Sequence, residues 1–313
     1  MWPALIRVAV PATTANLGPG FDSMGLALDL WNTFELHVGV GGSPITVEVE
    51  GEGADELPRD RSHVTADIML AELESARIQP PSTLLLRCRN DVPSASGLGS
   101  SSTAIVAGLI LADVLRLSVL HGRCVRPYEV DLEAVLSRAV ELEGHGDNVT
   151  PAVLGGLQVV YTRGAEYRNR AIPIPPMKVV ACIPRYRYLT ADARAALPEM
   201  VRHSDAVFNI GHAMLVIEAL RSRDDALLAD ALHDRLHEQY RFPSIPGAAE
   251  ARAAGLAAGA IAVCLAGAGP GLIALARAGH DAIGEAMVEA YGKRGVKARY
   301  WVLPASGGGV RVE

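Results

Sequence analysis

A run of small residues between a strand pattern and a helix pattern constrains this chain more than any other feature. The run spans 93–103 and reads P-S-A-S-G-L-G-S-S-S-T. Before it, 84–89 alternates with the two-residue period of a strand, and after it 105–112 repeats at helical spacing. Gly97 and Gly99 allow backbone angles that are closed to other residues and let a ligand approach the main chain. The sequence therefore predicts a tight strand-to-helix turn.

The turn also has the properties of a phosphate site. The first-turn amides of a helix have no partner within the helix, and they lie at the positive end of its dipole. Serines at 100–102 are of a residue type that caps helices, and amides grouped in this way attract phosphate oxygens. The lysine of a Walker P-loop is missing, so this is a different kind of phosphate loop. A capped turn that binds nothing is the alternative.

Composition limits the classes of partner. The formal net charge is −6 over 313 residues, which argues against a general nucleic-acid binder but leaves room for a small cationic pocket. Half of the residues are hydrophobic, enough for sizeable cores, and the length favours two domains. The four separate cysteines lack any C-x-x-C spacing and are expected to be structural thiols of a reducing compartment.

No membrane segment is expected. The uncharged stretch 253–276 is long enough to cross a bilayer. Glycines and a proline interrupt it, so we expect helix, strand, turn and strand instead. No signal peptide is visible, because a strand pattern begins almost at once. A cytoplasmic location is expected.

Strand and helix patterns alternate through both halves of the chain, which indicates the α+β class. A polar and then proline-rich segment at 163–176 is the expected boundary between domains of residues 1–165 and 166–313. Helices are expected over 62–78, 129–143, 199–220, 224–238, 247–258 and 281–291.

One carboxylate is expected to point inward from its helix. At 100° per residue, Glu143 falls on the apolar face with Leu136 and Val140, while Glu141 falls on the opposite face. An unpaired buried charge is costly. Mg²⁺ is one candidate partner, since it is commonly held by one or two carboxylates together with substrate phosphates. A glutamate at a helix end that simply reaches water is the alternative.

The histidines are not expected to hold a metal. His233 and His237 are four residues apart on the helix expected over 224–238, but neither a third ligand nor an H-E-x-x-H pattern accompanies them. His145 lies in a tight loop beside Asp147 and is expected to make a structural hydrogen bond. The loop at 11–23 offers an amide, Asn16, and a carboxylate, Asp22, which are also ordinary turn formers.

Four motifs in order resemble the GHMP family of small-molecule kinases, most closely the branch that phosphorylates L-homoserine. They are P-A-T-T-A-N-L-G-P-G-F-D at 11–22, P-x-x-x-G-L-G-S-S at 93–101, E-G-H-G-D-N at 143–148 and L-A-G-A-G-P at 265–270. Three residues depart from the family pattern: Gly146 replaces a proline, Ala266 a serine and Gly271 a threonine. The first loosens the loop around Asp147, and the other two remove hydroxyl groups from a glycine turn that is otherwise kept.

The resemblance implies an N-terminal domain of the ribosomal protein S5 domain 2 type and a ferredoxin-like C-terminal domain, with ATP and substrate between them. The residues implied to bind ATP are Pro93, Ser94, Ser96, Gly97, Leu98, Gly99, Ser100, Ser101 and Ser102. Those implied to hold Mg²⁺ are Ser100 and Glu143.

The implied reaction is phosphorylation of the side-chain hydroxyl of L-homoserine to O-phospho-L-homoserine, for threonine synthesis. Arg194 and Arg241 are forks suited to the substrate carboxylate, and Asp22 or Asp147 would pair with its ammonium. The groups near the reacting hydroxyl would be Asn16, Asp147 and Thr190. The residues implied to be catalytic are Asp22, Asp147 and Thr190. No general base is identified; Asp22 and Asp147 are the carboxylates to test, and alignment with charge stabilisation is favoured.

Two other functions stay open. One is a GHMP kinase that acts on another alcohol, such as mevalonate, shikimate or a sugar. The other is a nucleotide-binding protein without catalysis. The expected partners are small molecules, with neither nucleic acid nor membrane, and the resemblance is compatible with a homodimer.

Overall fold

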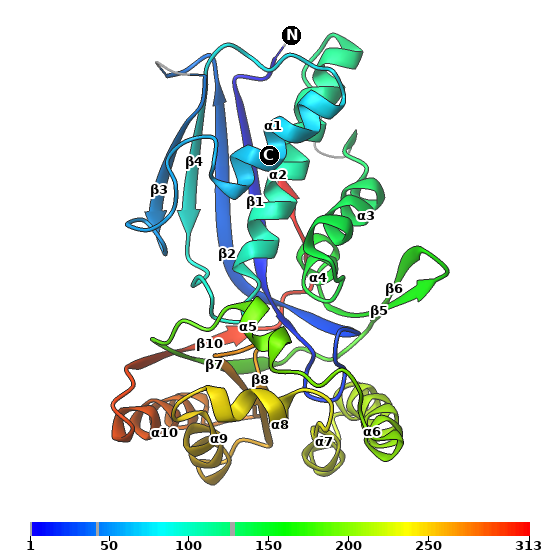
Figure 1. Cartoon of the computed structure of the whole chain (residues 1–313), viewed down its shortest axis with the longest axis vertical. Helices are drawn as coiled ribbons and strands as arrows, with labels where there is room; N and C mark the ends of the chain where they lie inside the picture. The colour runs from blue at the N-terminus through cyan, green and yellow to red at the C-terminus, as the bar shows by residue number, and fades with distance from the viewer. Residues whose placement is uncertain (1, 42–43, 126–128) are drawn as a thin grey trace.

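The structure is a computed structural model that describes residues 2–41, 44–125 and 129–313. Two layered domains are stacked along the longest axis of the molecule (Figure 1). Each domain has one β-sheet with helices packed against it. The expected two-domain α+β architecture is confirmed.

The first domain is built on a seven-stranded sheet. Its strands are β1 (Leu5–Ala15), β2 (Met24–Val38), β3 (Thr46–Gly51), β4 (Leu84–Asn90), β5 (Leu157–Arg163), β6 (Glu166–Ile172) and β11 (Arg311–Val312). They run in the order β11-β1-β2-β4-β3, while β5 pairs with β2 and with β6. The β3–β4 pair is parallel, and the other pairs are antiparallel.

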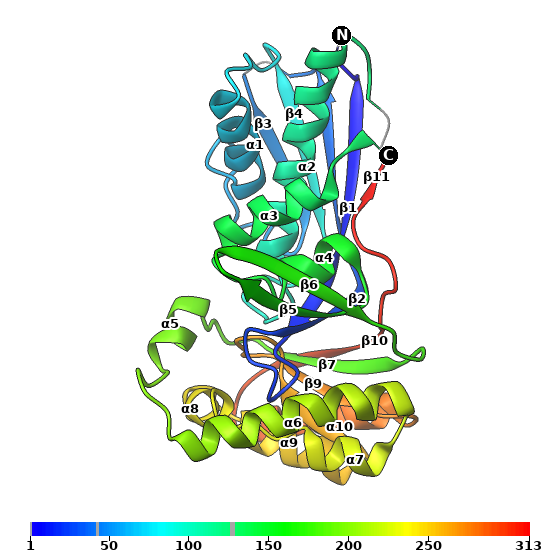
Figure 2. The ribbon, with the colours of Figure 1, turned by 90° about the vertical axis from the view of Figure 1, so that its right-hand side faces the viewer.

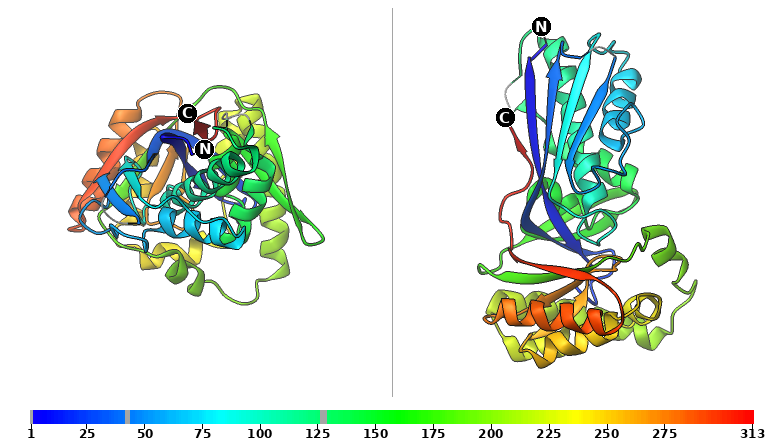
Figure 3. Two further views of the ribbon diagram at one scale, coloured as in Figure 1. Left: turned by 90° about the horizontal axis from the view of Figure 1, so that it is seen from above. Right: turned by 90° about the vertical axis from the view of Figure 1, so that its left-hand side faces the viewer.

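Sequence alternation determines which face of this sheet is buried. In β1, Ile6, Val8 and Val10 are buried while Arg7 between them is exposed, as a period of two requires. β1 pairs with β2 over the whole length of β1, with a register shift after Pro11. These two long strands carry the chain from the first domain down to the second (Figure 3). Their lower ends therefore bring the 16–23 loop to the junction.

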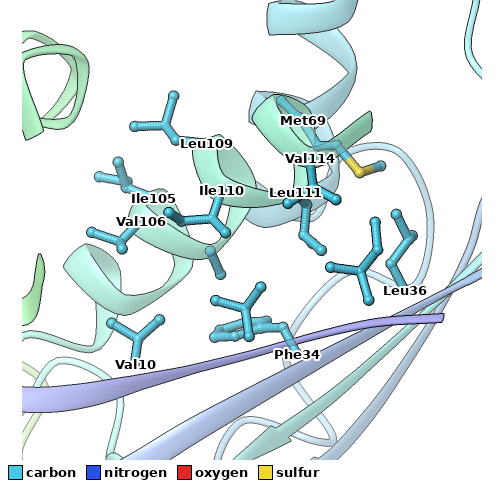
Figure 4. Close-up of a cluster of buried hydrophobic side chains, with 14 of the residues drawn as sticks. Val10, Phe34, Leu36, Met69, Ile105, Val106, Leu109, Ile110, Leu111 and Val114 are labelled. Atoms are coloured by element: carbon cyan, nitrogen blue, oxygen red, sulfur yellow. The ribbon is translucent and has the colours of Figure 1, made fainter. Parts of the chain in front are cut away.

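Helices cover one face of the first sheet (Figure 2). They are α1 (Val64–Ser75), α2 (Ser100–His121), α3 (Leu132–Glu143) and α4 (Val149–Leu154). The central helix, α2, packs against α1, α3 and the sheet. Figure 4 shows its side chains, among them Val106 and Ile110, above Val10 and Phe34 of the sheet. Burial of this apolar surface holds the start of α2 in a fixed place.

Among the described residues, one helix is long and apolar enough to cross a membrane by length and composition alone. It is α2, and 67% of the residues in its most apolar stretch are buried inside the domain. An apolar helix enclosed by a sheet and two other helices is a core helix. The stretch at 253–276 forms a helix, a strand, a turn and a strand, as expected.

The second domain has a four-stranded antiparallel sheet. Its strands are β7 (Lys178–Pro184), β8 (Ala262–Leu265), β9 (Leu272–Leu275) and β10 (Ala298–Pro304), in the order β10-β7-β9-β8. With helices between β7 and β8 and between β9 and β10, the chain follows the split β-α-β-β-α-β path. The expected ferredoxin-like arrangement is confirmed.

The helices of this domain lie mostly below its sheet (Figures 1 and 2). They are α5 (Thr190–Ala195), α6 (His203–Ser222), α7 (Asp225–Ala231), α8 (Glu238–Arg241), α9 (Ala248–Ala257) and α10 (His280–Lys293), with a short 3₁₀ turn, η2 (Phe242–Ser244). By contrast, α5 stands beside the junction of the two domains (Figure 2).

The chain passes between the two sheets at two places. β6 continues the first sheet as far as Ile172, seven residues past the expected division at 165/166, because it forms a hairpin with β5. The second sheet begins at Lys178. The end of the chain then returns to the first sheet, where β11 pairs with β1. The first sheet is therefore built from both ends of the sequence.

The helix expected over 224–238 is wrong in its second half. α7 ends at Ala231, and a turn separates it from α8. The cause is Asp234, whose carboxylate accepts hydrogen bonds from the backbone N–H groups of Leu236, His237 and Glu238. A short polar side chain that takes backbone donors in this way competes with the helical pattern. His233 and His237 therefore do not share a helix.

Candidate active site

A cleft of about 260 Å³ lies where the lower ends of the first domain meet the second. Six segments that are distant in sequence form its walls. The lining residues are Ala15, Asn16, Asp22, Ala95, Ser96, Gly97, Gly99, Ser100, Ser101, Ser102, Glu143, His145, Asp147, Asn148, Tyr188, Leu189, Arg194, Arg241, Gly267, Ala268 and Gly269. All four sequence motifs therefore meet in one place.

The glycine-serine turn ends at the N-terminus of α2, as its pattern predicts. The helix begins at Ser100, and its N-cap is Gly99, in the left-handed conformation with φ 69°. In the described part of the chain no side chain makes a capping hydrogen bond at this end, so the serines do not act as caps. Ser100, Ser101 and Ser102, whose amides lie in the first turn and have no partner within the helix, line the cleft.

Two glycines in the turn are required by close packing. A Cβ on Gly97 would lie 1.9 Å from the carbonyl oxygen of Ala266, and one on Gly99 would lie 2.1 Å from Oγ1 of Thr13. Both residues also have positive φ, which disfavours other side chains. The turn is thus pressed between β1 of one domain and the glycine turn of the other.

Not every residue of the expected nucleotide loop reaches the cleft. Ser96, Gly97, Gly99 and the three serines at 100–102 line it, whereas Pro93, Ser94 and Leu98 do not. Leu98 is buried in the core, and its N–H donates to Oγ of Ser96 across 3.2 Å. Its role is to anchor the turn from behind.

Glu143 stands at the C-terminal end of α3 and lines the cleft. It is partly buried, and its Oε1 accepts a hydrogen bond from Oγ of Ser102 at 3.2 Å. Glu141 points away and pairs with Arg138 at the surface. The expected assignment of helix faces is therefore confirmed.

Burial raises the pKa of the Glu143 carboxyl above its ordinary value, although His145, Ser102 and Arg194 oppose the shift. A buried carboxylate beside serine hydroxyls forms an oxygen-only donor set of the kind that hard cations prefer. Ser102, rather than Ser100, makes the contact with Glu143. No group of three or more acidic, histidine or cysteine side chains that could hold a metal by itself occurs in 2–41, 44–125 or 129–313.

His145 makes the hydrogen bond that its tight loop predicts. Its Nδ1 lies 2.7 Å from Oδ1 of Asp147, whose side chain is 3% exposed. Burial alone would lower the pKa of His145, but the hydrogen bond to Asp147 and the charges of Asp147 and Glu143 raise it above the ordinary value. The side chains of Glu143, His145 and Asp147 together line one side of the cleft, which we call the acidic wall.

The N-terminal loop is held across the cleft by polar contacts. Nδ2 of Asn16 donates to the carbonyl of Gly267 at 2.8 Å, and its Oδ1 accepts the N–H of Asp22 at 2.9 Å. Asn16 and Asp22 have φ of 73° and 52°, an uncommon conformation that asparagine and aspartate tolerate better than other residues. Thr13 donates from Oγ1 to Oδ1 of Asn148 at 2.8 Å. These contacts join three motifs.

Asp22 and Arg194 pair with each other. Nη2 of Arg194 donates to Oδ1 of Asp22 at 3.0 Å, and Nη1 donates to Oδ2 at 3.1 Å. The two side chains are 36% and 40% exposed. The sequence suggests both residues as separate substrate contacts and gives no sign of this ion pair.

Arg241 is in a different setting, since it is only 2% exposed. Its Nε donates to the carbonyl of Ala193 at 3.2 Å, and its Nη1 donates to Nδ1 of His237 at 3.1 Å. No carboxylate in the described part of the chain lies within ion-pair distance of it. Burial lowers the pKa of this guanidinium, while the negative charge of Asp22 opposes the shift. Arg241 lines the cleft without a direct ion-pair partner among the described residues.

Several residues at the site could not be read from the sequence. Thr13, Asn148 and His237 support the site through hydrogen bonds over more than a hundred positions. Tyr188 lines the cleft, and its hydroxyl is buried without a hydrogen-bond partner among the described residues. The side chain of Thr190 lies outside the described part of the structure. Its suggested catalytic role stays a prediction.

Comparison with family models gives two matches. Residues 64–156 match the GHMP kinases N terminal domain, and residues 216–293 match the GHMP kinases C terminal domain. The first match contains the glycine-serine turn and Glu143, and the second contains Arg241 and the glycine turn between β8 and β9.

Full-length relatives and solved structures agree with this. The homoserine kinase of Moorella thermoacetica is 39% identical, covering 93% of this chain and 94% of its own, and that of Mycolicibacterium vanbaalenii is 42% identical, covering 87% and 85%. The crystal structure of homoserine kinase from Cytophaga hutchinsonii superposes with a TM-score of 0.83 at 27% identity, covering 100% and 98%. A putative homoserine kinase from Listeria monocytogenes gives 0.73 at 31%, covering 98% and 99%.

Proposed function

The chain belongs to the GHMP kinase family, and from that premise we propose that it transfers a phosphoryl group from ATP to the side-chain hydroxyl of L-homoserine. The product would be O-phospho-L-homoserine, an intermediate of threonine synthesis. One observation carries this proposal most directly: a single cleft joins the start of helix α2 beside Glu143 to an end that contains the carboxylate of Asp22 and the guanidinium groups of Arg194 and Arg241. The full-length relatives that are called homoserine kinase support the substrate.

The nucleotide end is the turn at 96–102. Phosphoryl transfer depends mainly on positioning and on neutralising charge, and main-chain amides at a helix start supply both. Because the loop is wedged between Thr13 and Ala266, these donors are set in place before ATP binds. The triphosphate would lie along them.

Magnesium fits the donor set beside this turn. Glu143 would hold the ion together with a serine hydroxyl, from Ser100 or Ser102, and phosphate oxygens. When bound, the ion neutralises charge on the phosphate oxygens. The raised pKa of the Glu143 carboxyl means that a cation beside it would also relieve the cost of burying a negative charge.

The amino-acid end complements a zwitterion. Arg241 presents a buried guanidinium without a carboxylate partner among the described residues, which is costly unless an anion completes the site. The substrate carboxylate would do so. A carboxylate held by guanidinium forks gains charge-assisted and geometrically specific hydrogen bonds.

The ion pair of Asp22 and Arg194 would open for the substrate. The ammonium of homoserine can replace Arg194 beside Asp22, and its carboxylate can replace Asp22 beside Arg194. One ion pair then becomes two, and the net charge of this end is unchanged. Since both side chains are more than a third exposed, the existing pair is weak and easily exchanged.

The hydroxyl of the substrate would lie near the acidic wall. Asp147 already holds His145 at 2.7 Å, and Asn16 already holds the loop by both ends of its amide. We therefore assign these residues chiefly to alignment. In a loose transition state the proton leaves late, which reduces the need for a strong base.

A panel of acceptors tests the function against the alternatives. ATP turnover would be followed in a coupled assay with L-homoserine, mevalonate, shikimate and galactose, each with and without Mg²⁺. We expect Mg²⁺-dependent turnover with homoserine alone. Turnover with a neutral sugar or with mevalonate would show that the protein is a GHMP kinase for that alcohol and not for homoserine. ATP binding without turnover of any acceptor would favour a non-catalytic nucleotide-binding protein.

We propose two further properties, a cytoplasmic location and a homodimeric state. A biosynthetic kinase that phosphorylates a free amino acid with ATP belongs in the cytoplasm, where both substrates occur. A homodimer is a second property to test, by sedimentation or light scattering. Neither property is needed for the chemistry of the cleft.

A further inference from the structure

A buried polar cluster lies behind Arg241. His237 is completely buried, and so is the side chain of Asp234. Buried polar groups are costly unless they are hydrogen-bonded, and those of this cluster are bonded to each other and to the N-terminal loop. It comes from the turn that breaks the helix expected over 224–238. The resemblance to kinases offers no role for it.

Hydrogen-bond partners fix the protonation of His237. Its Nε2 lies 2.9 Å from the carbonyl oxygen of Gly18, which can only accept, so Nε2 carries the proton. Its Nδ1 lies 3.1 Å from Nη1 of Arg241, which can only donate. His237 is therefore a neutral imidazole whose Nδ1 accepts a hydrogen bond from the guanidinium of Arg241. Burial, which lowers its pKa, agrees with this form.

The cluster also fixes His237 itself. Oδ2 of Asp234 accepts the backbone N–H of His237 at 2.8 Å, and Oδ1 accepts Nδ2 of Asn209 at 2.7 Å. Nδ2 of Asn209 also donates to the carbonyl of Pro19 at 3.2 Å. Both Gly18 and Pro19 belong to the loop that carries Asp22. The cluster thus binds that loop through hydrogen bonds from His237 and Asn209 to the successive carbonyls of Gly18 and Pro19.

An aromatic ring completes the connection. Phe21, next to Asp22, stacks on His237 with ring centroids 5.1 Å apart. The guanidinium of Arg241 lies 5.2 Å from the centre of the same ring, within the range of a cation–π contact. The position of Arg241 is therefore tied to the loop of the other domain on two sides.

We propose that His237, held by Asp234, is a positioning residue that sets Arg241 for the α-carboxylate of the acceptor and keeps it in register with Asp22. This inference rests on the proposed function, because it assigns a job within the recognition of that amino acid. It makes selectivity for a carboxylate-bearing acceptor depend on an imidazole that does not touch the acceptor.

Two variants of His237 separate positioning from mere packing. His237→Phe keeps the ring and its stacking on Phe21 but removes both hydrogen bonds. His237→Asn restores an acceptor close to the place of Nδ1. His233→Phe makes the same change at an exposed position four residues earlier and serves as the matched control. Melting temperatures show whether each variant is folded.

The readout compares L-homoserine with 3-aminopropan-1-ol, which is the same acceptor without its carboxylate. For His237→Phe we expect KM for homoserine to rise by about tenfold or more, as for loss of hydrogen bonds to a charged group. Its kcat should stay within about threefold, and kcat/KM for 3-aminopropan-1-ol should not change, because only carboxylate recognition is affected. His237→Asn should recover most of the loss.

Each outcome decides one question. An unchanged ratio of the two acceptors in a folded His237→Phe variant would overturn this inference alone. An equal fall with both acceptors, unrelieved in His237→Asn, would also overturn it, because that is the result of general damage. If the unaltered protein fails to phosphorylate homoserine at all, the proposed function is at fault.

Discussion

Arg194 and Asp22 meet across the cleft in a two-point ion pair, with Nη2 and Nη1 of the arginine 3.0 and 3.1 Å from Oδ1 and Oδ2 of the aspartate. Asp22 belongs to a loop of the first domain, and Arg194 belongs to α5 of the second. The negative charge of Asp22 complements the ammonium group of an amino acid, and the positive charge of Arg194 complements its carboxylate. The pair therefore marks where the charged groups of the acceptor are expected to bind.

Removing the arginine should weaken acceptor binding. In Arg194→Leu we expect KM for homoserine to rise by about ten- to a hundredfold, because a charge-assisted hydrogen-bond pair is lost. KM for ATP should stay within about threefold, since the nucleotide end is separate. Steady-state kinetics with each substrate varied in turn measures both.

The matched control for this change is Arg168→Leu. Arg168 is an exposed arginine on β6 that pairs with Glu166, away from the cleft. It should leave both KM values as they are. If Arg194→Leu behaves like Arg168→Leu, the arginine does not contact the acceptor.

Close packing of the phosphate turn predicts a sharp difference between two glycines of similar conformation. Gly97→Ala would place a Cβ 1.9 Å from the carbonyl oxygen of Ala266, whereas Gly122→Ala, at the far end of α2, would meet none of the described residues within 4 Å. Both positions have positive φ, so both changes carry a strain of about 1–2 kcal/mol. Only Gly97→Ala should also displace the turn.

We therefore expect Gly97→Ala to raise KM for ATP by about tenfold or more, because misplaced donors lose much of their effect. Gly122→Ala should lower the melting temperature slightly and leave KM for ATP unchanged. Nucleotide titration and thermal melting distinguish the two effects. Equal kinetics for the two variants would mean that the turn does not hold the triphosphate.

The sequence predicts much of this site because its motifs are local. The turn at 93–103, the inward face of Glu143 and the loop of His145 each depend on neighbours within a few positions. Periodicity and glycine placement therefore determine them. The same reasoning gives the order of strands and helices in both domains.

The features that escape prediction depend on distant partners. The pairing of Asp22 with Arg194, and of Gly18 with His237, joins residues from different domains. The end of the helix before Asp234 could not be predicted either. Its neighbours have a helical pattern, and only the hydrogen bonds of its carboxylate show that the helix ends before it. At this position, hydrogen bonds from backbone N–H groups to the Asp234 carboxylate replace the helical hydrogen bonds that the local sequence favours.

His145 and Asp147 predict a pH-dependent contribution to stability. The pKa of His145 is raised in the folded protein, despite burial, by its bond to Asp147. A raised folded pKa means that the stabilisation is fully present below the unfolded value, about 6.5, and is lost as the pH rises through the folded value. The melting temperature of the unaltered protein should therefore exceed that of His145→Gln most at about pH 6.

Thermal melts of both proteins between pH 6 and pH 9, at one ionic strength, measure this difference. The gap should narrow steadily toward high pH. A gap that is constant, or that widens with pH, would show that the imidazole is neutral in the folded state and that the pair carries no charge.

We assign Glu143 to the magnesium–nucleotide end of the cleft, and the Mg²⁺ dependence of homoserine phosphorylation in two isosteric variants tests this assignment. Glu143→Gln keeps the shape but not the charge beside Ser102, while Glu141→Gln makes the same change on the exposed face of the same helix. We predict that Glu143→Gln lowers kcat by about a hundredfold or more and shifts half-saturation to higher Mg²⁺. Glu141→Gln should match the unaltered protein within about twofold, because exposed ion pairs contribute little. An unshifted Mg²⁺ curve with near-normal kcat in Glu143→Gln, or an equal loss in Glu141→Gln, would contradict the account.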